Sequence, residues 1–142
     1  MDQTKDYTEL HHKDIVAETS IEIEALVVVN EYMDCWNAKD ISGLDNTLHF
    51  PHIRIASGRV HTMERGEHDD QFFQKFIEQT GWAYSLWDYR RAIQSGSDKV
   101  HFAVQFTRYQ TDGKAIGVYP SMWIVTKING QWGIQARSSF AP

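Results

Sequence analysis

The first apolar pattern along the chain has helical spacing. Thr19, followed three residues later by Glu22, has the spacing of a capping box, in which each side chain binds a free backbone N–H of the other residue. Apolar side chains then recur on neighbouring turns, as in an amphipathic helix. We therefore predict a helix from Thr19 to about Ala38. Its inward stripe is expected to contain Ile23, Leu26, Val29 or Asn30, Met33, and Trp36 or Asn37.

The pattern after this helix predicts a second helix, a hairpin and a third helix. Asp40 can cap a short helix over "ISGLDNTL", and Ser57-Gly58 separates two runs of strand type, which is typical of a hairpin. A third helix is expected from about Glu64 to Thr80, where Gly81 stands at the usual C-terminal position. Its apolar stripe is Phe72, Phe73, Phe76 and Ile77.

From Trp82 onward the chain has the two-residue alternation of strands. Four runs are separated by the turn signals "SGSD", "TDG" and "NG": residues 82–94, 99–110, 115–128 and 131–140. Helices first and an antiparallel meander last predict an α+β domain, with about three helices on one face of a mostly antiparallel sheet. We expect residues 1–18 to form a polar tail or a short extra helix and residues 19–142 to form a single domain. The face of strand 82–94 that points inward stays open, because one face carries Trp82, Tyr84 and Leu86 and the other carries Ala83, Trp87 and Tyr89.

Composition and charge exclude several classes of protein. The formal net charge of -5 provides no basic excess for neutralising phosphates, so neither nucleic acid nor an anionic membrane is an expected partner. The single cysteine, Cys35, cannot form an internal disulfide, and no segment has the apolar length of a membrane span. A cytoplasmic protein is the default expectation. Aromatic residues reach 13%, which suits packed cores, interfaces and pockets alike.

The stretches "EYMDCWNAKDISGL" and "WIVTKINGQWGIQARSSF" together resemble the nuclear transport factor 2-like superfamily, which includes ketosteroid isomerase, scytalone dehydratase and SnoaL-like polyketide cyclases. "EYMDCWNAKDISGL" resembles the family's helical pair, and "WIVTKINGQWGIQARSSF" resembles its closing hairpin. The resemblance covers residues 20 to 140. It implies a cone-shaped fold in which a strongly curved sheet wraps the long helix around a deep apolar cavity.

The resemblance does not extend to steroid isomerase chemistry. Ketosteroid isomerase uses an aspartate base, with a tyrosine and a neutral aspartic acid as donors to the oxyanion. Tyr32 matches the position of the family's tyrosine, but the two acids would fall near Ala56 and Ile124, which are not carboxylates. No steroid isomerase of the usual two-aspartate kind is therefore expected.

The stretch "HFPHIRI" carries the candidate acid–base and charged groups. Alternation puts His52 and Arg54 on the face of Ala56, which the family resemblance implies is the inner one. Histidine suits proton transfer near neutral pH, and arginine can hold a carboxylate, phenolate or enolate. The alternative is that both lie at the rim in water while Ile53 and Ile55 face the core.

Tyr32 and Trp36 are either helix core or part of a cavity wall, and their spacing alone allows both. The resemblance favours the wall, where Tyr32 would donate to an oxyanion. The full candidate sets are Tyr32, His52 and Arg54 for catalysis, and Trp36, Phe102, Val104, Phe106, Met122, Ile124 and Trp132 for ligand binding.

No metal or cofactor is expected. His49, His52 and His61 are the only plausible metal set, but His49 and His52 fall on opposite faces of the same predicted strand. No phosphate-cradling glycine loop or dinucleotide fingerprint occurs. His68, near a helix start, is most simply solvated.

These observations support two functions of different classes. The first is a SnoaL-like pocket protein for a small apolar or aromatic molecule, with cofactor-free isomerisation, cyclisation or dehydration if it is an enzyme. The second is a non-catalytic dimerisation or accessory module whose cavity is filled by side chains such as Trp82, Trp87, Trp123 and Trp132.

A homodimer is expected from the last strands. If Met122, Ile124 and Trp132 face the cavity, then Tyr119, Ser121 and Trp123 lie on the outer face of the sheet. Large rings there would form an apolar patch that a partner covers. The family commonly pairs such sheets.

Overall fold

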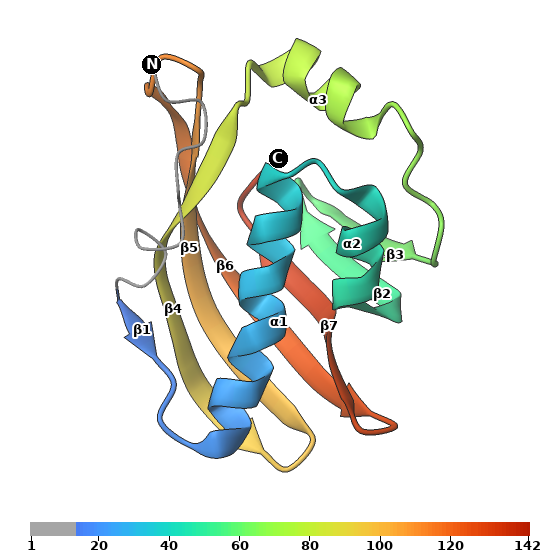
Figure 1. Ribbon diagram of the computed structural model, residues 1–142, viewed down its shortest axis with the longest axis vertical. Helices are drawn as coiled ribbons and strands as arrows, with labels where there is room; N and C mark the ends of the chain where they lie inside the picture. The colour runs from blue at the N-terminus through green and yellow to red at the C-terminus, as the bar shows by residue number, and fades with distance from the viewer. Residues whose placement is uncertain (1–13) are drawn as a thin grey trace.

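The computed structural model describes residues 14–142 and has the predicted α+β architecture (Figure 1). The predicted tail falls largely on residues 1–13, which lie outside the described residues. In chain order, the elements are β1 (Ile15–Val16), α1 (Ser20–Asn37), α2 (Ile41–Thr47), β2 (Leu48–Ala56), β3 (Arg59–Met63), α3 (Phe72–Thr80), β4 (Tyr84–Gly96), β5 (Lys99–Tyr109), β6 (Ala115–Ile128) and β7 (Gln131–Ser139).

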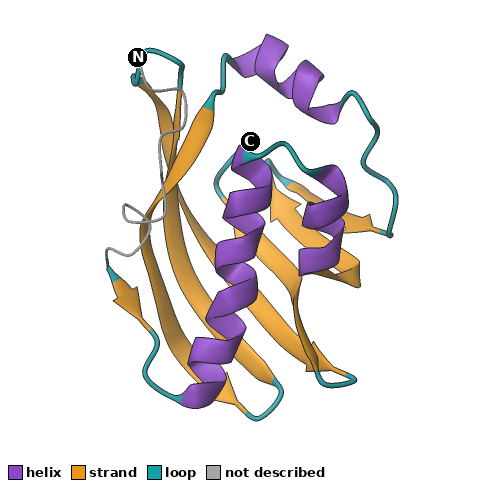
Figure 2. Ribbon diagram, in the orientation of Figure 1, coloured by secondary structure: helices purple, strands orange, loops and turns teal. Residues whose placement is uncertain are grey.

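The strands form one mixed sheet in the order β1-β4-β5-β6-β7-β2-β3. Strands β4 to β7 make the predicted antiparallel meander, and β2 joins its far edge parallel to β7. Helix α1 lies across one face of this sheet, with α2 beside it (Figure 2). The sheet contains one strand that the sequence did not predict: Ile15–Val16 is not tail or helix but pairs in parallel with β4.

Helix α1 begins and ends as its sequence predicts. The Thr19 hydroxyl accepts from the backbone N–H of Glu22 at 3.2 Å, and the Glu22 carboxylate accepts from the backbone N–H of Thr19 at 3.3 Å. Asp40 caps α2 in the same way, by accepting from the N–H of Gly43 at 2.9 Å. Local side-chain chemistry therefore determines both helix starts.

Helix α3 is shorter than its apolar pattern indicates. It was expected from Glu64 but begins at Phe72, because Gly66 has a φ of 85°, which no α-helix can contain. The Asp69 carboxylate accepts from the N–H of Gln71 at 2.8 Å and holds a loop in front of the helix. Gly81, with a φ of 74°, ends α3 as predicted. Residues 64–71 are therefore a loop, and His68 lies in it.

The predicted facing of β6 is wrong. Trp123 is only 1% exposed and Ser121 is buried, whereas Met122 is 40% exposed. The cause is the register with β5, in which Trp123 lies opposite Phe102 and Met122 lies opposite Ala103. Opposed residues share a face, so an inward Phe102 requires an inward Trp123.

On β4, the buried residues are Ser85, Trp87 and Arg90, so the face of Ala83 and Trp87 is the inner one at the start of this strand. The inner face of β5 agrees with the prediction, since Val100, Phe102 and Val104 are buried.

The homodimer stays a prediction, but Tyr119, Ser121 and Trp123 cannot form its surface as a group. Trp123 and Ser121 are buried within the chain, and Tyr119 packs against Phe106 with ring centroids 5.8 Å apart. Exposed apolar side chains on the opposite face of the sheet include Ile53, Ile55, Val60 and Met122. Across residues 14–142, none of the helices combines the length and the apolar character needed to cross a membrane.

The core position of Phe102 leads to a stability prediction. Its side chain has no exposed surface and lies in the cluster between α1 and the sheet. Phe102→Ala should lower the free energy of unfolding by about 3–5 kcal/mol, measured by urea denaturation, because it leaves a cavity. Val60→Ala, at a position 72% exposed on β3, is the control and should change that free energy by less than about 0.5 kcal/mol. Equal effects of the two substitutions would contradict this description of the core.

Candidate ligand-binding cavity

A cavity of about 360 Å³ lies between α1, α3 and the inner face of the sheet. Aromatic side chains from four different elements line it: Tyr32, Trp36, Phe72, Phe76, Phe106 and Trp123. Charged and titratable side chains line it as well: Arg54, Arg108, Arg137, His61, His68, Glu67 and Asp69. The lining is therefore an aromatic wall interrupted by charged groups.

Trp36 is the centre of the aromatic wall. Its ring meets Phe72, Phe73, Phe76 and Trp82 edge to face, with centroid distances of 5.0 to 5.7 Å. Tyr32, one turn earlier on α1, meets Trp123 of β6 edge to face at 4.9 Å. Such ring pairs add about 0.5–1.5 kcal/mol each beyond the area they bury, and these contacts stabilise the aromatic wall.

Arg137 of β7 connects α1 to β2 through hydrogen bonds. Its Nε donates to Nε2 of His52 at 2.9 Å, and its Nη1 donates to the hydroxyl oxygen of Tyr32. Its guanidinium carbon lies 4.9 Å from the centre of the Tyr32 ring. Because the Tyr32 oxygen accepts from Arg137, the hydroxyl hydrogen can donate to a molecule in the cavity.

His52 is held in a single neutral form. It has no exposed surface, and its Nδ1–H donates to the carbonyl oxygen of Ile134 at 2.9 Å while Nε2 accepts from Arg137. Burial, reinforced by the charge of Arg137, lowers the pKa of His52 to about 3. This corrects the expected role of His52: both ring nitrogens are occupied and it does not line the cavity, so it orients Arg137 rather than moving a proton.

Arg54 and Arg108 complete the cationic part of the lining. Arg54 donates through Nη2 to the carbonyl oxygen of Ala141 at 2.9 Å. Arg108 is buried and places its guanidinium over the rings of Phe76 at 4.9 Å and Tyr119 at 5.0 Å. Burial lowers the pKa of both arginines, although arginine stays charged in proteins.

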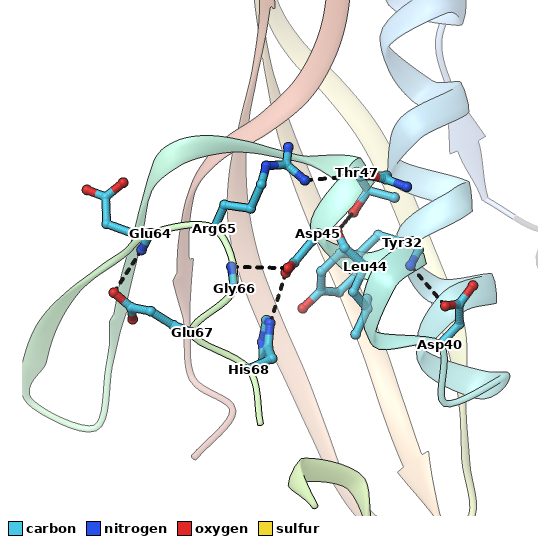
Figure 3. Close-up of polar contacts among 12 residues, drawn as sticks. Tyr32, Asp40, Leu44, Asp45, Thr47, Glu64, Arg65, Gly66, Glu67 and His68 are labelled. Carbon is cyan, nitrogen blue, oxygen red and sulfur yellow. Dashed lines mark hydrogen bonds and ion pairs between the residues drawn. The ribbon is translucent and has the colours of Figure 1, made fainter. Parts of the chain in front are cut away.

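His68 and Asp45 form a hydrogen-bonded pair at the cavity. The Asp45 side chain, near the end of α2, accepts from Nδ1 of His68 at 3.1 Å and from the backbone N–H of Gly66 at 3.3 Å (Figure 3). Both side chains are mostly buried, with exposed fractions of 13% for His68 and 12% for Asp45. The loop that interrupts the predicted third helix therefore supplies an imidazole whose Nδ1 is already bonded to a carboxylate.

The structure brings together only part of the predicted site. Tyr32, Trp36, Arg54 and Phe106 line the cavity. The other predicted ligand-binding residues lie elsewhere and are corrections to that set: Phe102 and Val104 in the core, Met122 and Ile124 on the outer face of β6, and Trp132 beside Glu24, to which its Nε1 donates at 3.1 Å.

Sequence reasoning missed Arg108, Arg137 and His68. Arg108 continues the alternation of Val104 and Phe106, and that signal was available in the sequence. Arg137 faces inward because Ile124 pairs with Ala136 while Val125 pairs with Ile134, which makes a bulge at Gln135. Without this bulge, the alternation along β7 would point Arg137 to the outer face. No signal in the sequence therefore indicated that Arg137 faces the cavity.

The three histidines considered for a metal lie apart. His49 bonds to Thr126 at 2.8 Å, His52 is enclosed behind Arg137, and His61 lies 3.5 Å from Glu67. Within the described part of the chain, no three histidine, cysteine or carboxylate side chains are grouped as metal ligands.

Comparison with solved structures agrees with the fold that the sequence resembles. No protein-family model matches the sequence, and no curated protein matches it either. A protein of unknown function with a cystatin-like fold from Nostoc punctiforme is similar, with a TM-score of 0.68 and 16% identity over 86% of this chain and 92% of that one. An NTF2-like protein from Novosphingobium aromaticivorans has a TM-score of 0.67 and 10% identity over 84% and 80% of the two chains.

A ketosteroid isomerase-like protein from Erwinia carotovora atroseptica is also similar, with a TM-score of 0.60 and 13% identity over 83% of this chain and 93% of that one. At these identities the likeness concerns the fold alone. The chain has the nuclear transport factor 2-like, cystatin-like α+β fold, which confirms the resemblance at that level.

The buried neutral form of His52 predicts how stability depends on pH. Its pKa is about 3 in the folded protein against an ordinary 6.5, so the unfolded chain takes up the proton first as the pH falls. The contribution of His52 is fully present above pH 6.5 and is lost as the pH falls from there toward 3. The free energy of unfolding of the wild type should therefore decline across this window more steeply than that of His52→Gln.

The difference in slope should approach about 1.4 kcal/mol per pH unit, the limit for one proton, and urea denaturation at several pH values measures it. Val60→Ala, which removes no titratable group and lies at an exposed position on β3, is the control and should keep the wild-type slope. If the free energy of unfolding of His52→Gln has the same slope against pH as that of the wild type, the pKa of His52 does not differ between the folded and the unfolded chain, which would contradict the prediction.

Proposed function

We propose that this protein binds a small apolar or aromatic molecule in the cavity beside Tyr32 and Trp36. One observation carries the proposal: about 360 Å³ of space remains inside a wall of six aromatic side chains. Small-molecule sites in proteins are concave, mainly apolar and roughly 300–1,000 Å³ in volume, with a few polar groups that orient the ligand. The hydroxyl of Tyr32 and the surrounding cations are suitable polar groups.

The alternative is an accessory module whose interior is filled. Trp82, Trp87 and Trp123 do fill much of the space between α1 and the sheet, and each is almost fully buried. Trp132 lies at another place, beside Glu24. The volume that remains next to the buried tryptophans favours ligand binding, since an interior with a purely structural role is normally close-packed.

Acid–base catalysis is a second candidate, which the pairing of His68 with Asp45 favours. Asp45 accepts from Nδ1–H of His68, so Nε2 is left as the basic nitrogen. A histidine oriented by a carboxylate is a frequent general base near neutral pH. This arrangement needs no cofactor and fits the isomerase or dehydratase classes.

The step that this pair would perform is removal of a proton from a carbon next to a carbonyl group. Nε2 of His68 takes the proton, and the C–H electron pair moves to the carbonyl oxygen to form an enolate. The Tyr32 hydroxyl donates to that oxygen, which stabilises the developing charge. Return of the proton from His68 to another carbon gives an isomer, and its return to the same carbon regenerates the molecule.

Filling the cavity should abolish binding. Met63 lines the cavity from β3, so Met63→Trp places a large ring in the space, whereas Met122→Trp adds the same ring on the outer face of β6. Titration calorimetry with indole should detect binding to the wild type and to Met122→Trp, with at least about a tenfold loss in Met63→Trp, because overlap with a bound ring removes its contacts. Undiminished binding to Met63→Trp would place the ligand elsewhere.

Catalysis by the pair is tested by hydrogen exchange. In deuterated buffer, the protein should accelerate loss of the methylene proton signals of phenylacetone, followed by proton NMR. His68→Gln should remove at least about 100-fold of this acceleration, the usual contribution of a general base, while binding of the ketone persists. Asp45→Asn should reduce the rate by a smaller factor, since it keeps the imidazole of His68 and replaces only the carboxylate that orients it.

The control for this measurement is His101→Gln, which changes a histidine on β5 that contacts Gln94 and does not line the cavity. It should exchange at the wild-type rate. A His68→Gln variant that is as fast as the wild type would exclude His68 as the base.

A further inference from the structure

Three arginines from three strands line the same cavity: Arg54 of β2, Arg108 of β5 and Arg137 of β7. We propose that the ligand is an organic anion, an aromatic carboxylic acid whose carboxylate is held by these guanidinium groups while its ring lies against the aromatic wall. The inference rests on the proposed binding function and adds the charge and class of the ligand. Its first support is that none of these three guanidinium groups is paired with a carboxylate of the described residues.

Among the described residues, none of the three arginines forms an ion pair with a carboxylate. Their polar contacts are with neutral groups: the Ala141 carbonyl for Arg54, and His52 and Tyr32 for Arg137. Arg108 rests on ring faces. A charge withdrawn from water is costly unless an opposite charge or several hydrogen bonds compensate for it.

The acidic residues of the lining have other partners. Glu67 lies 3.5 Å from His61, and Asp69 lies 3.5 Å from Lys75. Asp45, near the cavity, is bonded to His68 and Gly66. Each of these carboxylates therefore has a nearby partner other than the three arginines.

The arginines also repel one another. Arg54 and Arg137 are direct partners in the parallel register of β2 with β7, so both guanidinium groups leave neighbouring strands on the inner face. Burial lowers the pKa of Arg54, and the charge of Arg137 lowers it further. Because arginine does not give up its proton, an anion between these groups is the direct way to relieve the repulsion.

Carboxylate chemistry and the aromatic wall together define the class of ligand. A guanidinium donates two parallel hydrogen bonds to a carboxylate, and such charge-assisted bonds are roughly twice as strong as neutral ones. The rings of Trp36, Phe72 and Phe76 offer faces and edges to an aromatic body. An aliphatic acid would leave this wall unused, and a neutral aromatic would leave the three charges unbalanced.

The test compares each acid with its neutral amide, which keeps the shape and removes the charge. The probes are phenylacetate, indole-3-acetate and 2-naphthoate, each titrated beside its amide in the calorimeter at pH 7. At least one acid should bind about tenfold or more tightly than its amide, the factor expected for charge-assisted hydrogen bonds in a site withdrawn from water. Equal affinities of every acid and its amide would overturn the inference while leaving the pocket itself intact.

Two variants locate the effect. Arg108→Gln and Arg54→Gln should each weaken binding of the acid about tenfold and leave binding of the amide unchanged, since each removes a cation from the cavity. Arg137 is left in place because it holds Tyr32 and His52. The control is Arg91→Gln, an exposed arginine of β4 over Tyr89, which should leave both affinities unchanged.

Two further measurements distinguish loss of folding from loss of anion binding. Circular dichroism and thermal unfolding establish that each variant is folded, and retained amide binding establishes that its cavity is intact. If both arginine variants bind the amide normally and the acid as tightly as the wild type, the anion assignment is wrong. If no acid and no amide binds to the wild type at millimolar concentration, the proposed function fails together with the inference.

Discussion

The arrangement of the cavity depends on the position of one guanidinium group, that of Arg137. It donates to His52 on β2 and to Tyr32 on α1, and thereby connects the first helix to the strand next to the edge strand β3. His52 can accept that bond only while it is neutral, because its other nitrogen donates to Ile134. Burial ensures this by lowering the pKa of His52 far below its ordinary value. The orientation of Tyr32 toward the cavity therefore depends on an imidazole that does not itself line the cavity.

The interior combines two features that oppose each other energetically. Aromatic rings around Trp36 pack edge to face, while three arginines approach the same space without carboxylate partners. A domain selected only for stability would replace buried cations with apolar side chains, which is often neutral or stabilising. Retaining them costs stability, and unfavourable features of this kind gather at functional sites. The site thus differs from its surroundings by chemistry as well as by shape.

Most of the fold was predictable because local chemistry determines it. Thr19 and Glu22 cap the N-terminus of α1, and Asp40 caps that of α2. Ser57-Gly58 forms the hairpin turn between β2 and β3. The positions of Tyr32, Trp36, Arg54 and Phe106 on the inner side followed from helical spacing, strand alternation and the family resemblance. The predicted start of α3 was wrong, since the phenylalanine stripe outweighed Gly66. His68 was expected to be solvated, but its side chain is mostly buried beside Asp45.

The sequence by itself determined the order of elements, the helix caps and the turns, because each depends on neighbours a few residues apart. Only the tertiary structure decided which face of β6 is internal, since this follows from Phe102 lying opposite Trp123 on another strand. The same holds for Arg137, which faces inward because of a bulge in the pairing of β6 with β7. Strand register couples residues far apart in the chain, and a shift of one residue reverses every side chain. Which charged side chains line the cavity therefore depends on how the strands pair in the sheet.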